Sequence, residues 1–562
     1  MKLVLILQSL LFFACTQLVV AEELKGPTLS GASNFGHHWN AKTFSLSRKV
    51  PVLDFRDTIY WKRVERVENL FQFDKSTTNY PDKVKNIDAE MSLTVNWGNP
   101  RYDGGDTPYS NKAVQAFGRF AAEAVKRFPS IKYVEVGNEF NGQNFVKGKV
   151  KEQGLRERAA AHFALLKSVH QQVKSEDPDV KILGGATHSL PGAYLSMLFE
   201  MGAGTYMDGL AIHPYTTRPE QLKRQIDYLR SQIPELSRTP LHVTEFGEPN
   251  PEKASGHFLK KYCAMALSGV ERAAWYPMNE RGDGFVPLFE KTGQLTNVGR
   301  AYQIAQKHFA GKPVRDVSPD PFTYACQFDQ TAVVIWGEPR EFELLADGFQ
   351  VLDANGEPLD SKDVIISFDH PIILISESPF ELGEVLTLSK QKLVADSYHQ
   401  FQFITSADGR GTADAFERFA LRSGEKIALR TFDGQQRKGV LWVPHLGSEK
   451  LGRSRLSAQN FALTSSPNRQ LEIVHIYTAP SNQAVKIDAE IEVKSGTPEG
   501  ARLQLFHNDE LVDEGSKSGN KIAIKTEGVE LAIGDRLDFR IVRTKGIATV
   551  AGRYRFKLAT VP

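Results

Sequence analysis

Residues 133–140 have the sequence Tyr-Val-Glu-Val-Gly-Asn-Glu-Phe, an apolar run that ends in glycine and is followed at once by Asn138 and Glu139. Residues 241–247, Leu-His-Val-Thr-Glu-Phe-Gly, form a second such run, and Glu245 stands near its end. Short apolar runs bounded by glycine are typical of strands buried in a parallel sheet. Both stretches therefore predict a strand that presents a carboxylate at its C-terminal end.

Runs of this kind alternate with helical patterns between about residues 31 and 310. Apolar residues at helical spacing predict helices at 111–128 and 219–233. Eight strands that alternate with helices over this length predict an α/β fold, a (β/α)8 TIM barrel. A doubly wound sheet is the alternative, and it is disfavoured because no glycine-rich phosphate loop follows the first run. The predicted strands cover residues 31–36, 52–56, 92–96, 133–137, 181–185, 209–213, 241–245 and 273–277.

The helical period ends near residue 312, and β-type patterns follow. Turn pairs stand at Asp347-Gly348 and Asn355-Gly356, and apolar residues alternate with charged ones over 485–493. These patterns predict sandwich or jelly-roll domains. We predict a signal peptide at 1–21, the catalytic barrel at 22–312, a β-sandwich packed on it at 313–392, and a β-rich, jelly-roll-like accessory domain at 393–562.

Composition limits the classes of partner. The chain has 562 residues, and 69 Lys and Arg against 67 Asp and Glu give a net charge of +2. This balance gives no reason to expect nucleic acid as a partner. No stretch after the first 21 residues approaches the roughly 18 apolar residues of a membrane-spanning helix, so we expect no membrane span. The sequence does not indicate the oligomeric state.

The N-terminal segment predicts export. A basic residue precedes the mostly apolar residues 3–14, and Ala21 precedes an acidic pair, which is the layout of a secretory signal peptide. A secreted or periplasmic protein is expected, with lipoprotein anchoring at Cys15 as the alternative. Cys263 and Cys326 are then the only remaining cysteines. They either form a pair or are buried thiols, and we favour buried thiols.

The two strand-end carboxylates suggest a chemistry. Barrel enzymes carry their reactive groups at the C-terminal ends of the strands, where Glu139 and Glu245 are predicted to lie. Two opposed carboxylates suit glycosidic-bond cleavage, which needs an acid for the leaving oxygen and a nucleophile for the anomeric carbon. His37-His38 suggests a metal, but no third ligand stands at a recognisable spacing. We therefore predict no metal and no cofactor.

Gly137-Asn138-Glu139-Phe140 and Thr244-Glu245-Phe246-Gly247 resemble the acid/base and nucleophile motifs of clan A of the glycoside hydrolases, which are retaining (β/α)8 enzymes. The resemblance covers residues 31–310 and extends to segments 53–57, 96–100 and 213–215. It is closest to secreted bacterial members of family 39, with families 5 and 30 as alternatives.

The resemblance implies a role for each matching residue. Glu139 would be the acid/base, with a raised pKa, and Glu245 the nucleophile that forms a covalent glycosyl-enzyme. Asn138 would donate to the 2-hydroxyl of the sugar. The other residues implied to bind substrate or to support the nucleophile are Arg56, Asn96, Trp97, His213, Tyr215 and Trp275, and His37, His38 and Trp39 are further candidates for lining the same mouth.

These features predict a secreted retaining glycosidase that acts on a poly- or oligosaccharide. The alternatives are a catalytically silent protein that binds glycan or assists exopolysaccharide assembly, and a transglycosylase that uses the same site. Residues 474–480 resemble accessory domains of secreted polysaccharide-degrading enzymes, which implies carbohydrate binding, with a spacer role as the alternative. Because clan A chemistry draws its groups from the barrel, we expect a chain truncated near residue 392 to keep near-normal activity on small substrates.

Overall fold

Most of the chain is described by the computed structural model, which covers residues 23–33, 40–360, 362, 364–404, 414–436, 442–466, 469–544 and 546–561. The predicted signal peptide, with Cys15, lies outside the described residues, as do His37, His38 and Trp39. Over the residues that are covered, no helix is both long enough and apolar enough to cross a membrane.

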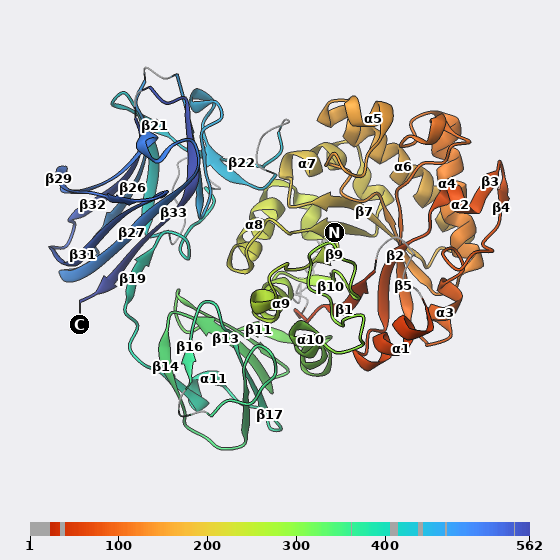
Figure 1. Ribbon diagram of the computed structural model, residues 1–562, viewed down its shortest axis with the longest axis horizontal. Coiled ribbons are helices and arrows are strands. Elements are labelled where there is room, and N and C mark those ends of the chain that lie inside the picture. Colours follow the sequence, from red (N-terminus) through yellow and green to blue (C-terminus); the bar gives the residue numbers. More distant parts are fainter. Residues whose placement is uncertain are drawn as a thin grey trace, which may run out of the picture.

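Eight parallel strands close into a barrel (Figure 1). They are β1 (Thr28–Ala32), β2 (Asp54–Thr58), β5 (Glu90–Val95), β6 (Ile131–Val136), β7 (Lys181–His188), β8 (Gly209–His213), β9 (Leu241–Phe246) and β10 (Val270–Trp275). Around the ring they follow the order β1-β10-β9-β8-β7-β6-β5-β2. Each predicted run overlaps one of these strands, so the predicted barrel is confirmed.

Helices cover the outside of the barrel and connect its strands. The start of α4 is capped by Ser110, which accepts the N–H of Ala113, and the start of α9 by Asn250, which accepts the N–H of Glu252. The connecting elements are α1 (Ala41–Lys49), α2 (Trp61–Val64), β3 (Glu65–Val67), β4 (Leu70–Phe71), α3 (Pro81–Lys85), α4 (Asn111–Arg127), α5 (Gly148–Glu152), α6 (Leu155–Glu176), α7 (Gly192–Glu200), α8 (Pro219–Gln232), α9 (Pro251–Ala266) and α10 (Asn297–His308).

The next segment forms two antiparallel sheets. The larger contains β11 (Val314–Asp316), β12 (Thr323–Phe328), β13 (Ala332–Gly337), β17 (Ile372–Ser376) and β15 (Phe349–Leu352), and the smaller contains β16 (Ile365–Ile366), β14 (Arg340–Leu344) and β18 (Leu386–Leu388). Helix α11 (Leu382–Val385) precedes β18.

A disulfide joins these sheets to the barrel. Cys263 of α9 is bonded to Cys326 of β12, and their Cα atoms are 5.9 Å apart. The expectation of free buried thiols was therefore wrong. Both cysteines are buried, as expected, but docking of the β12 sheet on α9 brings together two residues that are 63 positions apart.

The C-terminal part is a sandwich of two larger antiparallel sheets, as the alternating patterns predicted. One sheet contains β22 (Arg430–Phe432), β23 (His445–Gly447), β24 (Arg455–Leu456), β25 (Asn460–Thr464), β33 (Thr549–Thr560), β27 (Gln483–Ser495), β31 (Lys521–Leu531), β30 (Ser516–Ser518) and β19 (Leu393–Asp396). The other contains β21 (Glu425–Ala428), β20 (Phe416–Arg422), β26 (Leu471–Thr478), β32 (Arg536–Arg543), β28 (Ala501–His507) and β29 (Glu510–Glu514).

The segment after β22 leaves the sandwich and docks on the barrel beside α7 and α8 (Figure 1). The carbonyl oxygen of Asp433 accepts the N–H of Gly192 at 2.8 Å, and its carboxylate accepts the hydroxyl of Tyr228 at 2.6 Å. This docking brings the C-terminal sandwich to the end of the barrel at which the strand-end carboxylates lie.

Candidate active site

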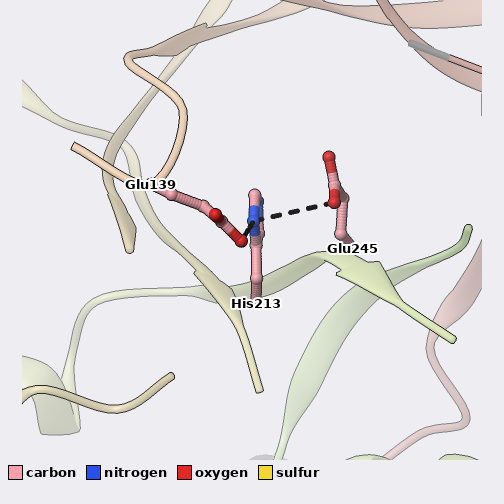
Figure 2. A group of neighbouring side chains, drawn as sticks. All are labelled: Glu139, His213 and Glu245. Atoms are coloured by element: carbon pink, nitrogen blue, oxygen red, sulfur yellow. Dashed lines mark hydrogen bonds and ion pairs between the residues drawn. The ribbon is translucent and has the colours of Figure 1, made fainter. Parts of the chain in front are cut away.

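Glu139 lies in a sharp turn that directly follows β6. Gly137 and Glu139 have positive φ angles of 96° and 45°. A non-glycine residue adopts this conformation only where the surrounding structure holds it. The turn directs the Glu139 side chain toward Glu245 (Figure 2). Its Oε1 lies 3.0 Å from Nδ1 of His188 and 3.4 Å from Nδ1 of His213.

Glu245 lies at the end of β9 and is only 6% exposed. Its Oε1 accepts a hydrogen bond from Nη1 of Arg56, and its Oε2 accepts the hydroxyl of Tyr215 at 3.0 Å. Two donors from different strand ends therefore fix the orientation of this carboxylate. The resemblance to clan A implied these contacts of Arg56 and Tyr215 with Glu245.

Glu139, His213 and Glu245 form one cluster, in which one ligand atom from each residue lies within 4.8 Å of the others. His213 is fully buried and stands between the two carboxylates (Figure 2). Its Nδ1 is 3.9 Å from Oε2 of Glu245. The barrel thus brings the two strand-end carboxylates, which are far apart in sequence, to opposite sides of one small space.

A buried ion pair inside the barrel supports the cluster, since its arginine also contacts Glu245. Nε of Arg56 donates to Oε2 of Glu135 at 2.6 Å, and the two side chains are 1% and 0% exposed. Thr94 and Thr244 also donate to Glu135, at 2.9 and 2.7 Å. Sequence reasoning missed Glu135 because it treated residues 133–137 as an apolar run. A carboxylate inside such a run was the available signal, since a buried charge requires a partner.

The electrostatics of the cluster favour a proton on His213, whereas the prediction was a proton on Glu139. Burial raises the pKa of Glu139, but hydrogen bonds from His188 and His213 outweigh burial and hold this pKa below its ordinary value. Burial lowers the pKa of His213, but the charge of Glu245 and hydrogen bonds to Glu135 and Glu139 outweigh it and raise the pKa to about 9. The expectation of a raised pKa at Glu139 was therefore wrong, because its two histidine neighbours were not considered.

The two predicted asparagines have different positions. Oδ1 of Asn138 accepts a hydrogen bond from Arg56 at 2.8 Å, which leaves its amide nitrogen to donate to a substrate. Both ends of the Asn96 amide contact the backbone: Oδ1 accepts the N–H of Asn138 at 3.0 Å, and Nδ2 donates to the carbonyl of Phe145 at 3.0 Å. Asn96 therefore positions Asn138, and its role in binding a sugar stays a prediction.

The two predicted tryptophans also differ. Trp275 is 0% exposed, its ring packs edge-to-face on Phe246 and Phe258, and its Nε1 donates to the carbonyl of Val286 at 2.9 Å. It is a core residue, so its predicted contact with a sugar ring was wrong. The sequence pattern could not distinguish the face of β10 that points outward. Trp97 is half-buried and lines a pocket, where a ligand can reach it.

Several residues at the site were missed by sequence reasoning. The ring of Trp442, from the C-terminal sandwich, packs edge-on against His188, and the ring centroids are 4.7 Å apart. Nearby, Gln435 donates to the carbonyl of Asn141 at 2.9 Å and accepts from the Asn141 amide at 2.8 Å. These contacts had no signal in the sequence, because Gln435 lies 294 positions after Asn141 and Trp442 lies 254 positions after His188.

The same cluster is the arrangement that best fits a metal ion among the described residues, since Glu139, His213 and Glu245 each offer a ligand atom. Arg56, however, already pairs with Glu245, and its Nη2 lies 3.4 Å from Nε2 of His213. A cation would therefore be placed against a guanidinium group and against a histidine whose pKa is raised. The charges of the site fit a substrate with hydroxyl groups better than they fit a metal.

Comparisons with known proteins agree with the barrel fold. Residues 115–302 match the family model of the glycosyl hydrolase catalytic core. A family 39 glycoside hydrolase from the gut symbiont Bacteroides cellulosilyticus has a TM-score of 0.53 and 16% identity, and the match covers 62% of this chain and 81% of that one. Part of the barrel is therefore similar to a glycosyl hydrolase catalytic core, and the predicted resemblance to the barrel glycoside hydrolases is confirmed.

Two further solved structures have lower TM-scores. A family 30 endoxylanase from Clostridium papyrosolvens has a TM-score of 0.46 and 11% identity, over 64% of this chain and 98% of that one. A family 86 β-porphyranase from the human gut bacterium Bacteroides plebeius has a TM-score of 0.44 and 12% identity, over 95% of this chain and 96% of that one. No curated protein matches the chain.

Proposed function

We propose that the protein is a secreted, retaining O-glycosidase that cleaves a poly- or oligosaccharide through a covalent glycosyl-enzyme. The observation that carries this proposal is the closeness of the two carboxylates, which have oxygen atoms within 4.8 Å of each other. Retaining enzymes place their carboxyl groups about 5–5.5 Å apart, whereas inverting enzymes need about 6.5–9.5 Å to admit a water molecule. The glycosyl hydrolase core supports the assignment of the bond class.

Each residue of the cluster has a role in the first step. Glu245, oriented by Arg56 and Tyr215, attacks the anomeric carbon while the bond to the leaving oxygen breaks. Glu139 gives its proton to that oxygen. The free amide nitrogen of Asn138 donates to the 2-hydroxyl of the sugar, a contact that strengthens in the transition state.

The second step reverses these transfers. A water molecule gives a proton to Glu139 while its oxygen attacks the anomeric carbon, and the bond to Glu245 breaks. The product keeps the configuration of the substrate because two inversions have occurred at the same carbon. A sugar hydroxyl in place of water would give transglycosylation, and no feature of the site favours that acceptor over water.

His213 supplies the proton that Glu139 needs. Because the pKa of His213 is raised to about 9, its ring carries a proton at neutral pH, 3.4 Å from Oε1 of Glu139. We infer that a substrate in the mouth excludes water and disfavours a second negative charge near Glu245, so that this proton moves to Glu139. The histidine thereby keeps Glu139 ready to act as an acid even though its own pKa is low.

Export is supported by the disulfide. Structural disulfides persist in oxidising compartments and are rare in the cytosol. The Cys263–Cys326 bond therefore agrees with the predicted signal peptide, and we propose that the protein acts outside the cytoplasm.

The proposal is tested on a panel of aryl β-glycosides and polysaccharides, with Glu245→Gln as the inactive comparison. We expect turnover of at least one aryl glycoside by the wild type, loss of turnover in Glu245→Gln, and a product of retained configuration by NMR. Inverted product would overturn the nucleophile assignment. Binding of glycans without turnover of any substrate would instead support the silent glycan-binding alternative.

A further inference from the structure

A second pocket opens beside the catalytic cluster, between the segments that follow β2 and β5. It has a volume of about 410 Å³. Its lining consists of two aromatic residues, three cationic residues and a proline–glycine floor: Tyr60, Trp97, Lys62, Arg63, Lys147, Gly98, Pro100, Gly104 and Gly105. None of the residues that line it is acidic.

The three cations are held near the two aromatic rings. Nζ of Lys62 and the guanidinium carbon of Arg63 lie 6.0 and 5.0 Å from the centre of the Tyr60 ring, and Nζ of Lys147 lies 5.5 Å from the centre of the Trp97 ring. The rings themselves are stacked, with centroids 6.2 Å apart. Three positive side chains, two from helix α2 and one from the residue that precedes α5, are thereby gathered around one space.

The cations have no acidic partner in the described part of the chain. No ion pair of the described residues includes Lys62, Arg63 or Lys147. Two aspartates flank the glycine floor, but neither lines the pocket. Asp103 accepts the N–H groups that precede α4, and the carboxylate of Asp106 lies against Gly148 at the start of α5.

The pocket is connected to the catalytic site through one hydrogen bond. Asn96, which directly precedes Trp97, accepts the N–H of Asn138, which directly precedes Glu139. The hydrogen bond therefore joins the neighbour of Trp97, which lines the pocket, to the neighbour of Glu139, the proposed acid/base.

We propose that this pocket is a subsite for a negatively charged sugar residue of the substrate, which carries a carboxylate or a sulfate group. The proposal rests on the proposed glycosidase function and names its substrate class. Like charges that share a pocket repel one another, and an anionic group relieves this repulsion while it accepts charge-assisted hydrogen bonds. A neutral sugar would leave the three cations uncompensated.

The aromatic rings and the glycines fit the same ligand. The exposed part of Trp97 offers an apolar surface to the CH groups of a sugar ring. Gly104 has open space around its Cα, so a ligand can approach the backbone there without meeting a side chain. The pocket thus combines surfaces for a sugar ring with charges for an acidic substituent.

The test measures binding to Glu245→Gln by calorimetry, with neutral, uronate-containing and sulfated oligosaccharides of equal length, and with inorganic sulfate alone. We expect one anionic series to bind at least about tenfold more tightly than the neutral series, and this ratio to fall with added salt. The series that binds more tightly, uronate-containing or sulfated, identifies the acidic group that the pocket holds. Binding of inorganic sulfate as tight as that of the sugars would overturn the sugar subsite.

Substitutions of the three cationic residues test whether the preference for anionic oligosaccharides arises in this pocket. We expect Lys62→Ala, Arg63→Ala and Lys147→Ala each to reduce the anionic preference several-fold, and Lys132→Ala and Arg238→Ala, exposed residues away from the pocket, to leave it unchanged. Equal affinity for neutral and anionic oligosaccharides would overturn the subsite while leaving the glycosidase intact. Tight anionic binding by a wild type that cleaves no glycoside would overturn the glycosidase and not the subsite.

Discussion

Trp442 of the C-terminal sandwich packs edge-on against His188 of the barrel, with ring centroids 4.7 Å apart and ring planes at 88°. His188 in turn lies 3.0 Å from Glu139. A residue of the last domain therefore stands one side chain away from Glu139, the proposed acid/base. From the sequence we expected all catalytic groups to come from the barrel, so that removal of the sandwich would leave activity on small substrates near normal. This contact predicts instead that its removal lowers that activity.

The first prediction concerns truncation near residue 392. The shortened chain loses Trp442 and Gln435, so His188 and the turn at Asn141 lose contacts that hold them. We expect kcat/KM on small aryl glycosides to fall about tenfold or more, because small displacements of catalytic groups are costly. Circular dichroism is measured on the same sample to test whether the truncated chain is folded.

Full-length Trp442→Ala and Gln435→Ala separate lost contacts from general damage. Both are expected to lower kcat/KM, and Lys517→Ala, on an exposed strand of the same sandwich, serves as the unaffected control. A folded truncated enzyme with normal activity on small substrates would restore the original view that the barrel acts alone.

The second prediction separates the two glutamates by kinetics. Glu245→Ala should abolish turnover of every substrate, because no nucleophile remains. Glu139→Ala should retain the first step on substrates with activated leaving groups, which need little protonation. Added azide should restore rate to Glu139→Ala with retained configuration. Azide rescue of Glu245→Ala with retained configuration would instead mean that the two roles are exchanged, because azide that replaces a lost nucleophile gives a product of inverted configuration.

The third prediction concerns the buried arginine. Arg56→Met leaves Glu135 and Glu245 buried without their cation, which should cost about 3–5 kcal/mol in the free energy of unfolding measured with urea. Arg127→Met is the matched control, since its ion pair with Asp82 is solvent-exposed. Removing an exposed pair should cost about 0–1 kcal/mol. Equal losses in the two variants would contradict the assigned burial of the Arg56–Glu135 pair.

The fourth prediction concerns pH. Because the pKa of His213 is raised from 6.5 to about 9, its contribution to stability is complete below pH 6.5 and is lost as the pH rises through about 9. The free energy of unfolding of the wild type should fall relative to that of His213→Gln between these pH values, by on the order of 1–3 kcal/mol.

The comparison with His213→Gln cancels other groups that titrate in the same range. Lys261 is one of them, since burial lowers its pKa to about 7. A difference between the two proteins that does not change with pH would show that His213 is not protonated in the folded state, and that Glu139 must obtain its proton elsewhere.

Local patterns determined the barrel and the positions of its two carboxylates. A strand is recognised from the spacing of its own apolar residues, and parallel strands of one barrel end at the same rim. Glu139 and Glu245 could therefore be assigned to the rim without knowledge of any contact. The support of Glu245 by Arg56 and Tyr215 was implied only by the resemblance to clan A, and not by the local patterns.

The tertiary structure decided the partners of these residues. The contacts of Arg56 with Glu135 and Glu245 span 79 and 189 positions, and that of Asn141 with Gln435 spans 294. Spacing within a strand or helix carries no information about such pairs, because barrel closure and domain docking create them. The outward packing of Trp275, the low pKa of Glu139 and the Cys263–Cys326 bond were misjudged for the same reason: each depends on neighbours that are brought close only when the chain is folded.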